Sequence, residues 1–587
     1  MWECGCIIVD PSRIFDEFPA PSYRGMQRQA LEDIQAAFRA GNDVVLVRAP
    51  TGSGKSLLAR AIAGCARRVE DAAPAEPTDA YYTTPQVSQL DDVTGDDLLD
   101  DLNVIRGKGN YSCILPGETT TPVNKAPCVR QRGFSCPVQH RCPYFADRAI
   151  AANRPIAAMT LAYFMQTAGS DVFGKRDVVV IDEAHGLSEW AEMYATIELS
   201  PRTVPVWESC RPPKISDLVA VEQYAERVQR VCTRRRERLQ EKSELTPDEA
   251  EERDRLQEIH RELGWLRDDL RDPDSPTMWV VDQPDGKGTA VTIKPVDPAR
   301  YLHHTVWNRG EKFVLLSATI LSKEGFCRSA GLDPSTVALV DVPHTFPVEN
   351  RPLFDITQGK MTYEHRDETL PKIARTVVQL MVKHPEEKGL IHAHSYDIAN
   401  TLLESFRDFG VSDRVRAHDK QTRDAALDSW KRSDEPLIFL SVKMEEALDL
   451  GHDACRWQVL CKAPYPNTRD SRVQKRLNAG RWNWYYRATL RTVIQACGRV
   501  VRSPTDYGAT YIADASILDV FDRAAGDMPV WFHDSVEKIS HPTLPSFNPD
   551  KAVATARSQV NRSWGSDPSS QSSTVQSHPL SDVWGDK

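Results

Sequence analysis

Short apolar runs alternate with amphipathic segments along most of the chain, and each run has the length of a buried strand. The first, at 44–47, is rich in β-branched residues, and a Gly-rich turn and a helix that opens near Lys55 follow it. Similar runs lie at 178–181, 311–321 and 456–466. Alternation of buried strands with helices predicts an α/β fold in which helices flank parallel sheets.

A charged helical block interrupts this alternation. Residues 205–275 predict two long helices, at about 216–242 and 247–271, and Pro247 is expected to start the second. We interpret most of this charge as a solvated helical face, with a binding surface as the alternative. The pattern predicts a helical domain at 205–300 inserted into the first α/β domain.

Composition narrows the class of protein without identifying a partner. Of the 587 residues, 41% are hydrophobic and 27% are charged, as in an ordinary globular protein. The net charge of −10 neither indicates nor excludes a nucleic-acid binder, because local basic patches set the field in a groove. Without a long apolar run or a secretory leader, we expect a cytoplasmic protein and no membrane contact. In that setting the thirteen cysteines are expected to be thiols or metal ligands.

The turn APTGSGKS at 49–56 matches the phosphate-binding loop known as Walker A, except that Ala49 replaces the usual glycine. Its glycines let consecutive backbone N–H groups surround phosphate oxygens at a helix N-terminus. Lys55 can reach the β- and γ-phosphates, and the Ser56 hydroxyl can ligate Mg²⁺. A Gly-rich turn without a ligand is the alternative. The predicted nucleotide-binding residues are Thr51, Gly52, Ser53, Gly54, Lys55 and Ser56.

Upstream of this loop, the spacing of Met26, Ala30, Ile34 and Phe38 predicts an amphipathic helix. Gln27 stands near its start and could read the adenine edge with its amide. The alternative is a surface glutamine.

The apolar run at 178–181 ends in Asp182-Glu183-Ala184-His185, a DEAH sequence. Carboxylates at the carboxyl edge of a buried parallel strand lie where such sheets bind ligands. Asp182 would hold Mg²⁺, and Glu183 would orient and deprotonate the attacking water. At the end of another strand, the small hydroxyl residues of the Ser317-Ala318-Thr319 sequence can hydrogen-bond the DEAH segment and a neighbouring domain.

A second α/β block begins near 345, and it contains an acidic turn with Glu446 and Asp449. The segment 467–491 carries seven Arg or Lys residues against one Asp. Its interleaved aromatic residues are Trp482, Trp484, Tyr485 and Tyr486. These rings could stack on bases, or they could form a buried helical face, and both can be true.

Next in the chain, Gln495, Arg499 and Arg502 occupy positions i, i+4 and i+7, which predicts one face of a helix over 492–503. Two arginines presented together at a nucleotide site can act as arginine fingers on the γ-phosphate.

Residues 105–146 are loop-like and contain Cys113, Cys128, Cys136 and Cys142, separated by 14, 7 and 5 residues. None of these spacings is the C-x₂-C knuckle typical of structural zinc. Four thiolates at long spacings suit an iron–sulfur cluster held by four cysteines. Zinc and unrelated buried thiols are the alternatives.

These motifs, in this order, resemble the XPD/DinG iron–sulfur helicases of superfamily 2. The resemblance rests on APTGSGKS, the four cysteines, DEAH, SAT, the EALDL segment and QACGRVVRS, with YRGMQ, YTTP, CPYF and IHAHSY, and it extends from about Tyr23 to residue 520. It implies two recombinase-like P-loop motor domains, with an iron–sulfur domain and a helical arch inserted into the first. It also implies translocation on single-stranded DNA, usually 5′ to 3′, driven by ATP.

The resemblance also implies roles for individual residues. Lys55 and Ser56 would hold the nucleotide and Mg²⁺, with Asp182 as the metal residue and Glu183 as the water residue. Gln495, Arg499 and Arg502 would close the site from the second motor domain. Glu446 and Asp449 match the acidic coupling motif and would contribute to the nucleotide site, with Ala447 where glycine is usual.

The function predicted from the sequence is therefore an ATP-dependent DNA helicase with a 4Fe–4S cluster, acting as a monomer on single-stranded and forked DNA. The alternatives are an RNA helicase with a zinc-bound cysteine domain, a nucleic-acid-binding remodeller, and an ATPase that acts on proteins. A bacterial or phage source is expected, and roles in repair, replication or phage biology all stay open. The predicted domains are 1–104, 147–204 and 301–345 for motor domain 1, 105–146 for the cluster, 205–300 for the arch, 346–545 for motor domain 2 and 546–587 for a disordered tail.

Overall fold

The computed structural model describes residues 11–65, 79–131, 133–170, 172–273, 275, 278–283, 290–442 and 450–553. The predicted coupling residues Glu446 and Asp449 lie outside these described residues. Contacts divide the chain into two units. The first unit comprises Met1–Asn350, Pro464–Asp506 and Leu518–Lys538, and the second comprises Arg351–Ala463, Tyr507–Ile517 and Ile539–Lys587.

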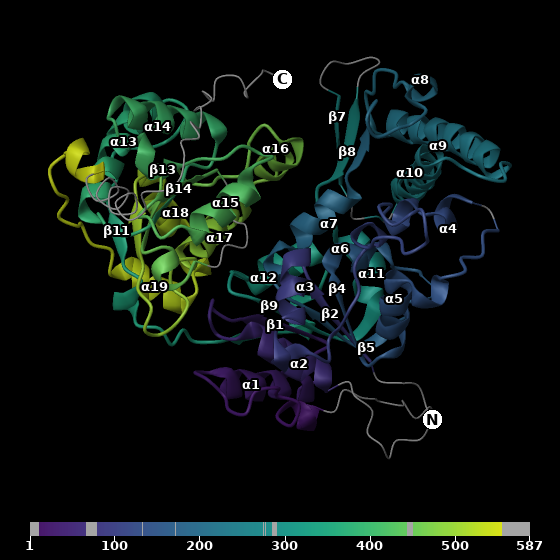
Figure 1. Ribbon diagram of the computed structural model, residues 1–587, viewed down its shortest axis with the longest axis horizontal. Coiled ribbons are helices and arrows are strands. Elements are labelled where there is room, and N and C mark those ends of the chain that lie inside the picture. The colour runs from purple at the N-terminus through teal and green to yellow at the C-terminus, as the bar shows by residue number, and fades with distance from the viewer. Residues whose placement is uncertain are drawn as a thin grey trace, which may run out of the picture. The chain divides into compact units, whose positions relative to one another are not determined.

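The first unit is built on a seven-stranded parallel sheet with the order β10-β1-β9-β5-β2-β4-β3 (Figure 1). Its strands are β1 Val44–Arg48, β2 Ala80–Thr84, β3 Asn103–Val104, β4 Ile156–Thr160, β5 Arg176–Ile181, β9 Gly310–Ser317 and β10 Val337–Asp341. Val314 of β9 lies opposite both Val45 of β1 and Val180 of β5. These three strands therefore end close together at one edge of the sheet.

Alternate side chains of β1 enter two different cores. Val45 and Val47 pack in one core with α2, whereas Leu46 belongs to the other. This period of two is what a strand in the interior of a sheet requires. The helices that accompany the sheet are α1 Gln27–Arg39, α2 Lys55–Gly64, α3 Val87–Thr94, α5 Pro143–Asn153, α6 Leu161–Gln166, α7 Leu187–Ala195, α11 Ala299–Thr305 and α12 Lys323–Ala330.

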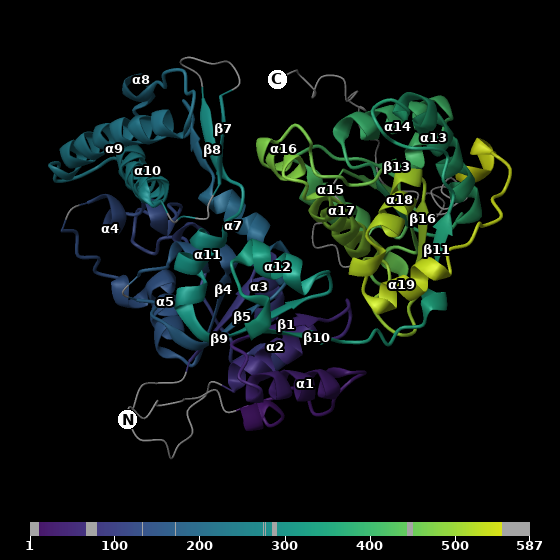
Figure 2. The ribbon, with the colours of Figure 1, turned by 180° about the vertical axis from the view of Figure 1, so that it is seen from behind.

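A small antiparallel sheet leads from the parallel sheet into a helical insertion (Figures 1 and 2). Its strands have the order β6-β8-β7, with β6 Ile197–Leu199, β7 Trp279–Asp282 and β8 Val291–Pro295. The helices are α8 Trp207–Cys210, α9 Leu218–Gln240 and α10 Pro247–Arg271. Because β6 pairs with β8, the insertion begins before residue 205, the boundary that the sequence predicted.

The second long helix begins where the sequence predicts. Pro247 is its first residue, and the Thr246 hydroxyl accepts a hydrogen bond from the Glu249 N–H at 3.2 Å. The Glu249 carboxylate accepts one from the Thr246 N–H at 3.1 Å, which completes a capping box. Apolar residues of α9 and α10 form a core of their own with the small sheet.

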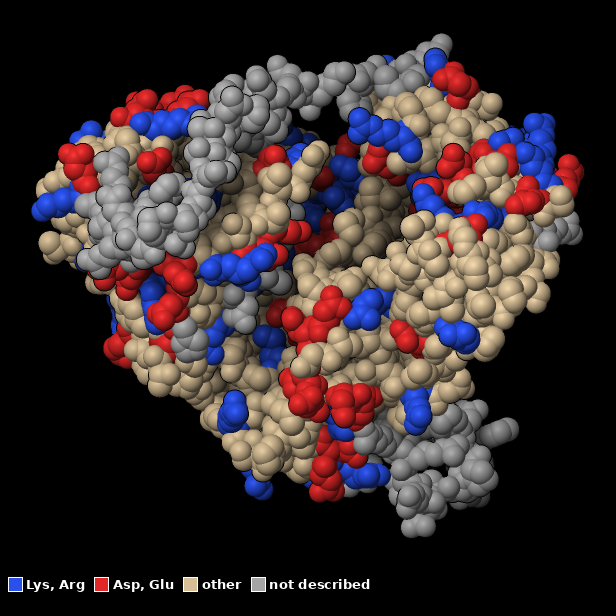
Figure 3. Space-filling model, in the orientation of Figure 1, with Lys and Arg blue, Asp and Glu red and all other residues tan. Residues whose placement is uncertain are grey.

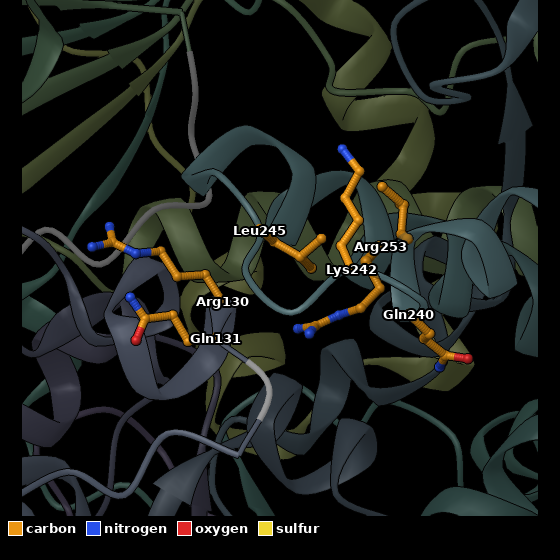
Figure 4. Close-up of a pocket in the computed structure, with 7 residues that line it drawn as sticks. Arg130, Gln131, Gln240, Lys242, Leu245 and Arg253 are labelled. Atoms are coloured by element: carbon orange, nitrogen blue, oxygen red, sulfur yellow. The ribbon is translucent and has the colours of Figure 1, made fainter.

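The cysteine segment contains α4, Pro127–Arg130, and packs against the turn between α9 and α10. The Leu245 N–H donates to the Arg130 carbonyl at 3.0 Å, and Arg253 donates to the Val129 carbonyl at 3.1 Å. A pocket of about 340 Å³ lies at this junction (Figure 4). It is lined by Arg130, Gln131, Leu239, Gln240, Lys242, Leu245 and Arg253.

The second unit has a six-stranded parallel sheet with the order β11-β16-β15-β12-β14-β13. Its strands are β11 Leu353–Asp355, β12 Gly389–His392, β13 Val415–Arg416, β14 Ile438–Ser441, β15 Trp457–Leu460 and β16 Ala509–Ile512. The helices α13 Arg366–Lys383, α14 Tyr396–Asp408 and α15 Arg423–Arg432 belong to the same unit, and α18 Ala515–Arg523 begins in it. Two α/β units with parallel sheets confirm the predicted fold class.

One stretch expected in the second motor domain makes its contacts with the first unit. It contains α16 Ser471–Asn478 and α17 Trp482–Cys497, and α19 Val530–Glu537 is grouped with the same unit. The buried Arg476 guanidinium pairs with Glu192, and Arg481 pairs with Asp297 at 2.7 Å. Because of these ion pairs, this stretch belongs to the first unit, and the predicted motor domain 2 at 346–545 does not form one unit.

The predicted tail begins too early. Ala552 and Val553 are 2% and 3% exposed in the core of the second unit, and the Ala552 carbonyl accepts a hydrogen bond from Arg414 at 2.9 Å. Residues 546–553 are therefore part of the fold, because their apolar side chains are removed from water. Residues 554–587 lie outside the described part of the chain.

Two truncations test this boundary. A chain that ends at residue 545 should lose about 2–4 kcal/mol of unfolding free energy, because it loses the buried Val553 and Ala552 and the packed Phe547. A chain that ends at residue 560 keeps these contacts and serves as the control. Chemical denaturation measures both. Equal stability of the two truncations would contradict the packing described here.

Candidate active site

The phosphate loop joins β1 to α2, as the sequence predicts. Gly52 and Gly54 have φ values of 80° and 78°, a left-handed conformation that favours glycine. Gly54 is the N-cap of α2, so Lys55 and Ser56 begin the helix. Because the first turn of a helix leaves its N–H groups without helical partners, this loop has the form of an anion site.

Gln27 is buried, which excludes the surface alternative. Its side chain is 3% exposed and its amide nitrogen donates to the Ser53 carbonyl at 3.1 Å. Its amide oxygen accepts from the Arg24 N–H at 2.8 Å. Gln27 therefore links the segment before α1 to the phosphate loop. Contact with adenine stays a prediction.

The DEAH carboxylates lie beside the loop. Asp182 is 9% exposed, and burial together with Glu183 raises its pKa to about 6. Although burial opposes it, the Lys55 ammonium, His185 and Arg499 lower the pKa of Glu183. Lys55 Nζ lies 3.6 Å from Glu183 Oε1. Glu183 thus stays ionised next to the cation that is predicted to hold phosphates.

The backbone at Glu183 is unusual. Its φ of 48° and ψ of 41° lie in the left-handed region, which costs a residue with a side chain about 1–3 kcal/mol. Its N–H donates to Asp182 Oδ1 at 2.8 Å. Strain of this kind gathers at functional sites, where surrounding contacts enforce it.

His185 connects the DEAH segment to two other segments. Its Nδ1 lies 2.9 Å from Ser317 Oγ and 3.3 Å from Glu183 Oε2. Its Nε2 lies 2.6 Å from the Gln495 amide nitrogen, which also donates to Thr319 Oγ1 at 3.3 Å. Since the Gln495 amide donates, His185 Nε2 must accept, and Nδ1 then carries the proton toward Ser317 and Glu183.

The structure confirms that Ser317 and Thr319 hydrogen-bond the DEAH segment and the later motif. It corrects the shape of that motif. Helix α17 ends at Cys497 with Gly498 as its C-cap, so Gln495 is in the last turn and Arg499 and Arg502 follow the helix. Glycine and the β-branched pair at 500–501 disfavour helix at this point.

The segment after α17 nevertheless lies on the phosphate loop. A Cβ on Gly498 would be 3.1 Å from Thr51 Oγ1, and one on Gly52 would be 3.0 Å from the Arg502 carbonyl. The charge of Arg499 acts on Glu183. The first unit thus brings the predicted loop, the DEAH carboxylates and the later motif together.

Two residues at the site escaped the sequence analysis. A Cβ on Gly52 would lie 2.6 Å from Phe346 Cζ, so the Phe346 ring is seated on the phosphate loop. Tyr82, on β2, hydrogen-bonds Ser56, and burial and Asp182 raise its pKa. Neither residue belongs to a local motif, and only long-range contacts place it.

Several aromatic side chains of the basic and aromatic segment at 467–491 pack on neighbouring side chains. Tyr485 stacks on Tyr465 at 5.1 Å, and the Arg476 guanidinium lies 4.4 Å from the centre of the Trp484 ring. Trp482 is 49% exposed. Base stacking on these rings stays a prediction.

The four cysteines of the insert lie near one another. Burial raises the pKa of Cys128, and Cys136, Cys113 and Cys142 raise it further. Among the described residues, no three His, Cys, Asp or Glu side chains form a site for a single metal ion. Four cysteine thiolates are the donor set of a 4Fe–4S cluster, which stays a prediction.

The described residues include no helix long and apolar enough to cross a membrane.

Two family models match the chain. The model described as DEAD_2 matches residues 135–204, and the model described as helicase C-terminal domain matches residues 377–535. The XPD_Helicase structure is 15% identical with a TM-score of 0.55, covering 89% of this chain and 100% of that one. The structure of S. tokodaii Xpd4 is 18% identical with a TM-score of 0.51, covering 86% and 98%. The matched segments are thus similar to two helicase family models, and the fold is similar to that of the XPD structures.

Curated proteins that are similar to parts of this chain carry helicase names. The ATP-dependent DNA helicase chl-1 of Caenorhabditis elegans is 26% identical over 251 residues, which are 39% of this chain and 28% of the relative. The XPD/RAD3 helicase subunit of Saccharomyces cerevisiae transcription and DNA repair factor IIH is 24% identical over 185 residues, which are 27% of this chain and 23% of the relative. The chain thus spans about a quarter of their length. Both are eukaryotic, which lends no support to the predicted bacterial or phage source.

The role of Gln27 can be tested without nucleotide. Gln27→Ala removes two hydrogen bonds of a buried amide and should lower the unfolding free energy by about 1–3 kcal/mol. Gln29→Ala on the same helix is the control, because the Gln29 bond to Asp33 is exposed. Denaturant unfolding measures both. Equal stability of the two variants would show that Gln27 does not brace the loop.

Proposed function

We propose that this chain is an ATP-dependent DNA helicase. The observation that carries the proposal is the meeting of three segments in one unit: the phosphate loop at 51–56, the DEAH segment at 182–185 and the segment at 495–502. Together these segments supply a loop that binds phosphates, a carboxylate that activates water and an arginine that contacts the transferred phosphoryl group. DNA as substrate is supported by the names of the chl-1 and XPD/RAD3 relatives.

Each side chain has a defined task in ATP hydrolysis. Lys55 binds the β- and γ-phosphates, while the Ser56 hydroxyl and the Asp182 carboxylate are the donors that Mg²⁺ prefers. A Mg²⁺ ion held by these two donors would neutralise charge on the phosphates. Glu183 accepts the proton of the attacking water, which its ionised state allows. Arg499 stabilises negative charge on the γ-phosphoryl group.

Hydrolysis can be sensed through the hydrogen bonds of His185. Glu183 contacts His185, and His185 contacts Ser317 and Gln495. A change at Glu183 therefore reaches both β9 and α17 through side-chain bonds. We propose that this network couples ATP hydrolysis to movement along single-stranded and forked DNA, 5′ to 3′, by a monomer.

We further propose that Cys113, Cys128, Cys136 and Cys142 hold a 4Fe–4S cluster. The electrostatic influence of the other three thiols on Cys128 supports the assignment. A cluster bound by these four cysteines would stabilise the loop-rich segment that packs on the helical insertion, because a segment with few apolar residues needs another source of stability.

Two substitutions test ATP hydrolysis at this site. Lys55→Ala and Glu183→Gln should each lower DNA-stimulated ATP turnover by about 10²–10⁴-fold, because each removes a group that acts on the phosphates or the water. Glu183→Gln should still bind ATP. The control is Lys175→Ala, an exposed lysine paired with Glu311.

Unwinding of duplexes with a 5′ or a 3′ tail, made of DNA or RNA, gives the second readout. The proposal predicts unwinding of the 5′-tailed DNA duplex and none by the two site variants. Normal turnover by either variant would contradict the proposed site. Unwinding of RNA alone would contradict the DNA assignment.

Metal analysis tests the cysteine segment. Anaerobically purified protein should contain about four irons and four acid-labile sulfides per chain. Cys113→Ser should lose them, whereas Cys327→Ser, at a buried cysteine of α12, should keep them. One zinc without sulfide would overturn the cluster assignment.

A further inference from the structure

Helix α9 exposes a straight row of arginines. Arg230, Arg234 and Arg238 are exposed and recur every four residues, so their side chains share one face of the helix. At 1.5 Å per residue, the row extends about 12 Å along the axis. We call these three residues the α9 ridge. Figure 3 shows Lys and Arg side chains interspersed with Asp and Glu side chains at the outer edge of the insertion, where Figure 1 places α9.

Ion pairs within the described residues do not involve the ridge, although they involve most other arginines of the insertion. Arg235 pairs with Glu252 at 2.7 Å, and Arg267 pairs with Glu222 at 3.0 Å. The same holds for Arg211 with Glu208, Arg255 with Glu258, Arg271 with Glu222 and Arg300 with Asp272. Most other arginines of the insertion are therefore paired with carboxylates, whereas the ridge arginines, like the exposed Arg261, make no ion pair among the described residues.

The exposed face of α10 carries mostly the opposite charge. Asp248, Glu251, Asp254 and Asp268 are exposed there. The two helices pack on each other through their apolar sides, and exposed carboxylates are more frequent on α10 than on α9, although Glu251 pairs with Lys125 and Asp254 with Arg253. A polyanion would be attracted to α9 more than to α10, so it would bind on the α9 side of the insertion.

The ridge arginines lie four residues apart, a spacing at which like charges repel by about 0.2–0.5 kcal/mol per pair. The exposed Glu237 and Glu241 stand three residues after Arg234 and Arg238, so opposite charges offset part of this repulsion. The neighbouring Arg227 differs, because it donates to the Arg211 carbonyl and lies over the Tyr224 ring.

We propose that the α9 ridge binds the phosphate backbone of nucleic acid, independently of sequence. A row of evenly spaced guanidinium groups matches a polymer with one negative charge per repeat unit, and arginine is the residue best suited to phosphate. This inference rests on the proposed DNA helicase function and adds a contact surface on the insertion that is separate from the ATP site.

The test compares binding of fluorescent oligonucleotides by anisotropy at several salt concentrations. The ridge variant Arg230→Gln, Arg234→Gln, Arg238→Gln should bind about tenfold more weakly at low salt than the unmodified chain. The slope of log affinity against log salt should fall by about 2 for a single strand, because three phosphate contacts are lost. A hairpin duplex of the same sequence shows which form of backbone the ridge holds.

The control removes three other exposed arginines of the same insertion: Arg211→Gln, Arg261→Gln, Arg271→Gln. It should keep most of the affinity and the salt slope. The ridge variant should unfold at about the same temperature as the unmodified chain, because the three side chains are exposed and make no ion pair among the described residues. Its ATP turnover without DNA should be unchanged.

The outcomes separate this proposal from the proposed function. If the unmodified chain binds DNA and the ridge variant binds with equal affinity and slope, the ridge proposal is overturned and an acidic protein becomes the alternative partner. An equal loss in ridge and control variants would also overturn it, because charge anywhere on the insertion would then suffice. If the unmodified chain binds no nucleic acid, both proposals fail.

Discussion

The register of three parallel strands is the constraint on which the candidate site depends. Val314 of β9 lies opposite Val45 of β1 and Val180 of β5, so these strands end at one edge of the first sheet. The chain leaves that edge into the phosphate loop, the DEAH segment and the segment of Ser317. Since side chains alternate along a strand, a slip of one residue in any strand would turn its buried residues to the wrong face. The geometry of the site is therefore held by the hydrophobic core.

His185 links the segments that this alignment brings together. Its Nδ1 faces Ser317 and Glu183, and its Nε2 accepts from Gln495, so both ring nitrogens are engaged. With the Gln495 amide nitrogen facing Nε2, Nδ1 is the ring nitrogen left to donate toward Ser317 and Glu183. A carboxylate that changes partners during hydrolysis would disturb this arrangement directly. We propose that the histidine of the DEAH sequence links segments that the two carboxylates do not reach.

Local motifs predicted the residues of the site better than they predicted the backbone around them. Lys55 and Glu183 follow buried strands, and the chemistry of each is readable from its neighbours in the sequence. The end of α17 at Cys497 was missed, because residues 492–503 keep helical spacing beyond Gly498. Phe346 was missed because only a contact nearly 300 residues away in sequence, with the phosphate loop, gives it a role. The burial of residues 546–553 likewise depends on partners in distant segments.

The central claim is that the DEAH segment and the segment at 495–502 act as one site. A double-mutant cycle with His185→Ala, Gln495→Ala and the double variant, measured as DNA-stimulated ATP turnover, tests it most directly. Because the two side chains share one hydrogen-bond network, the account predicts a coupling energy of about 0.5–3 kcal/mol, with the double variant barely worse than the worse single one. Additive losses would show that the two segments act independently, and would contradict the account.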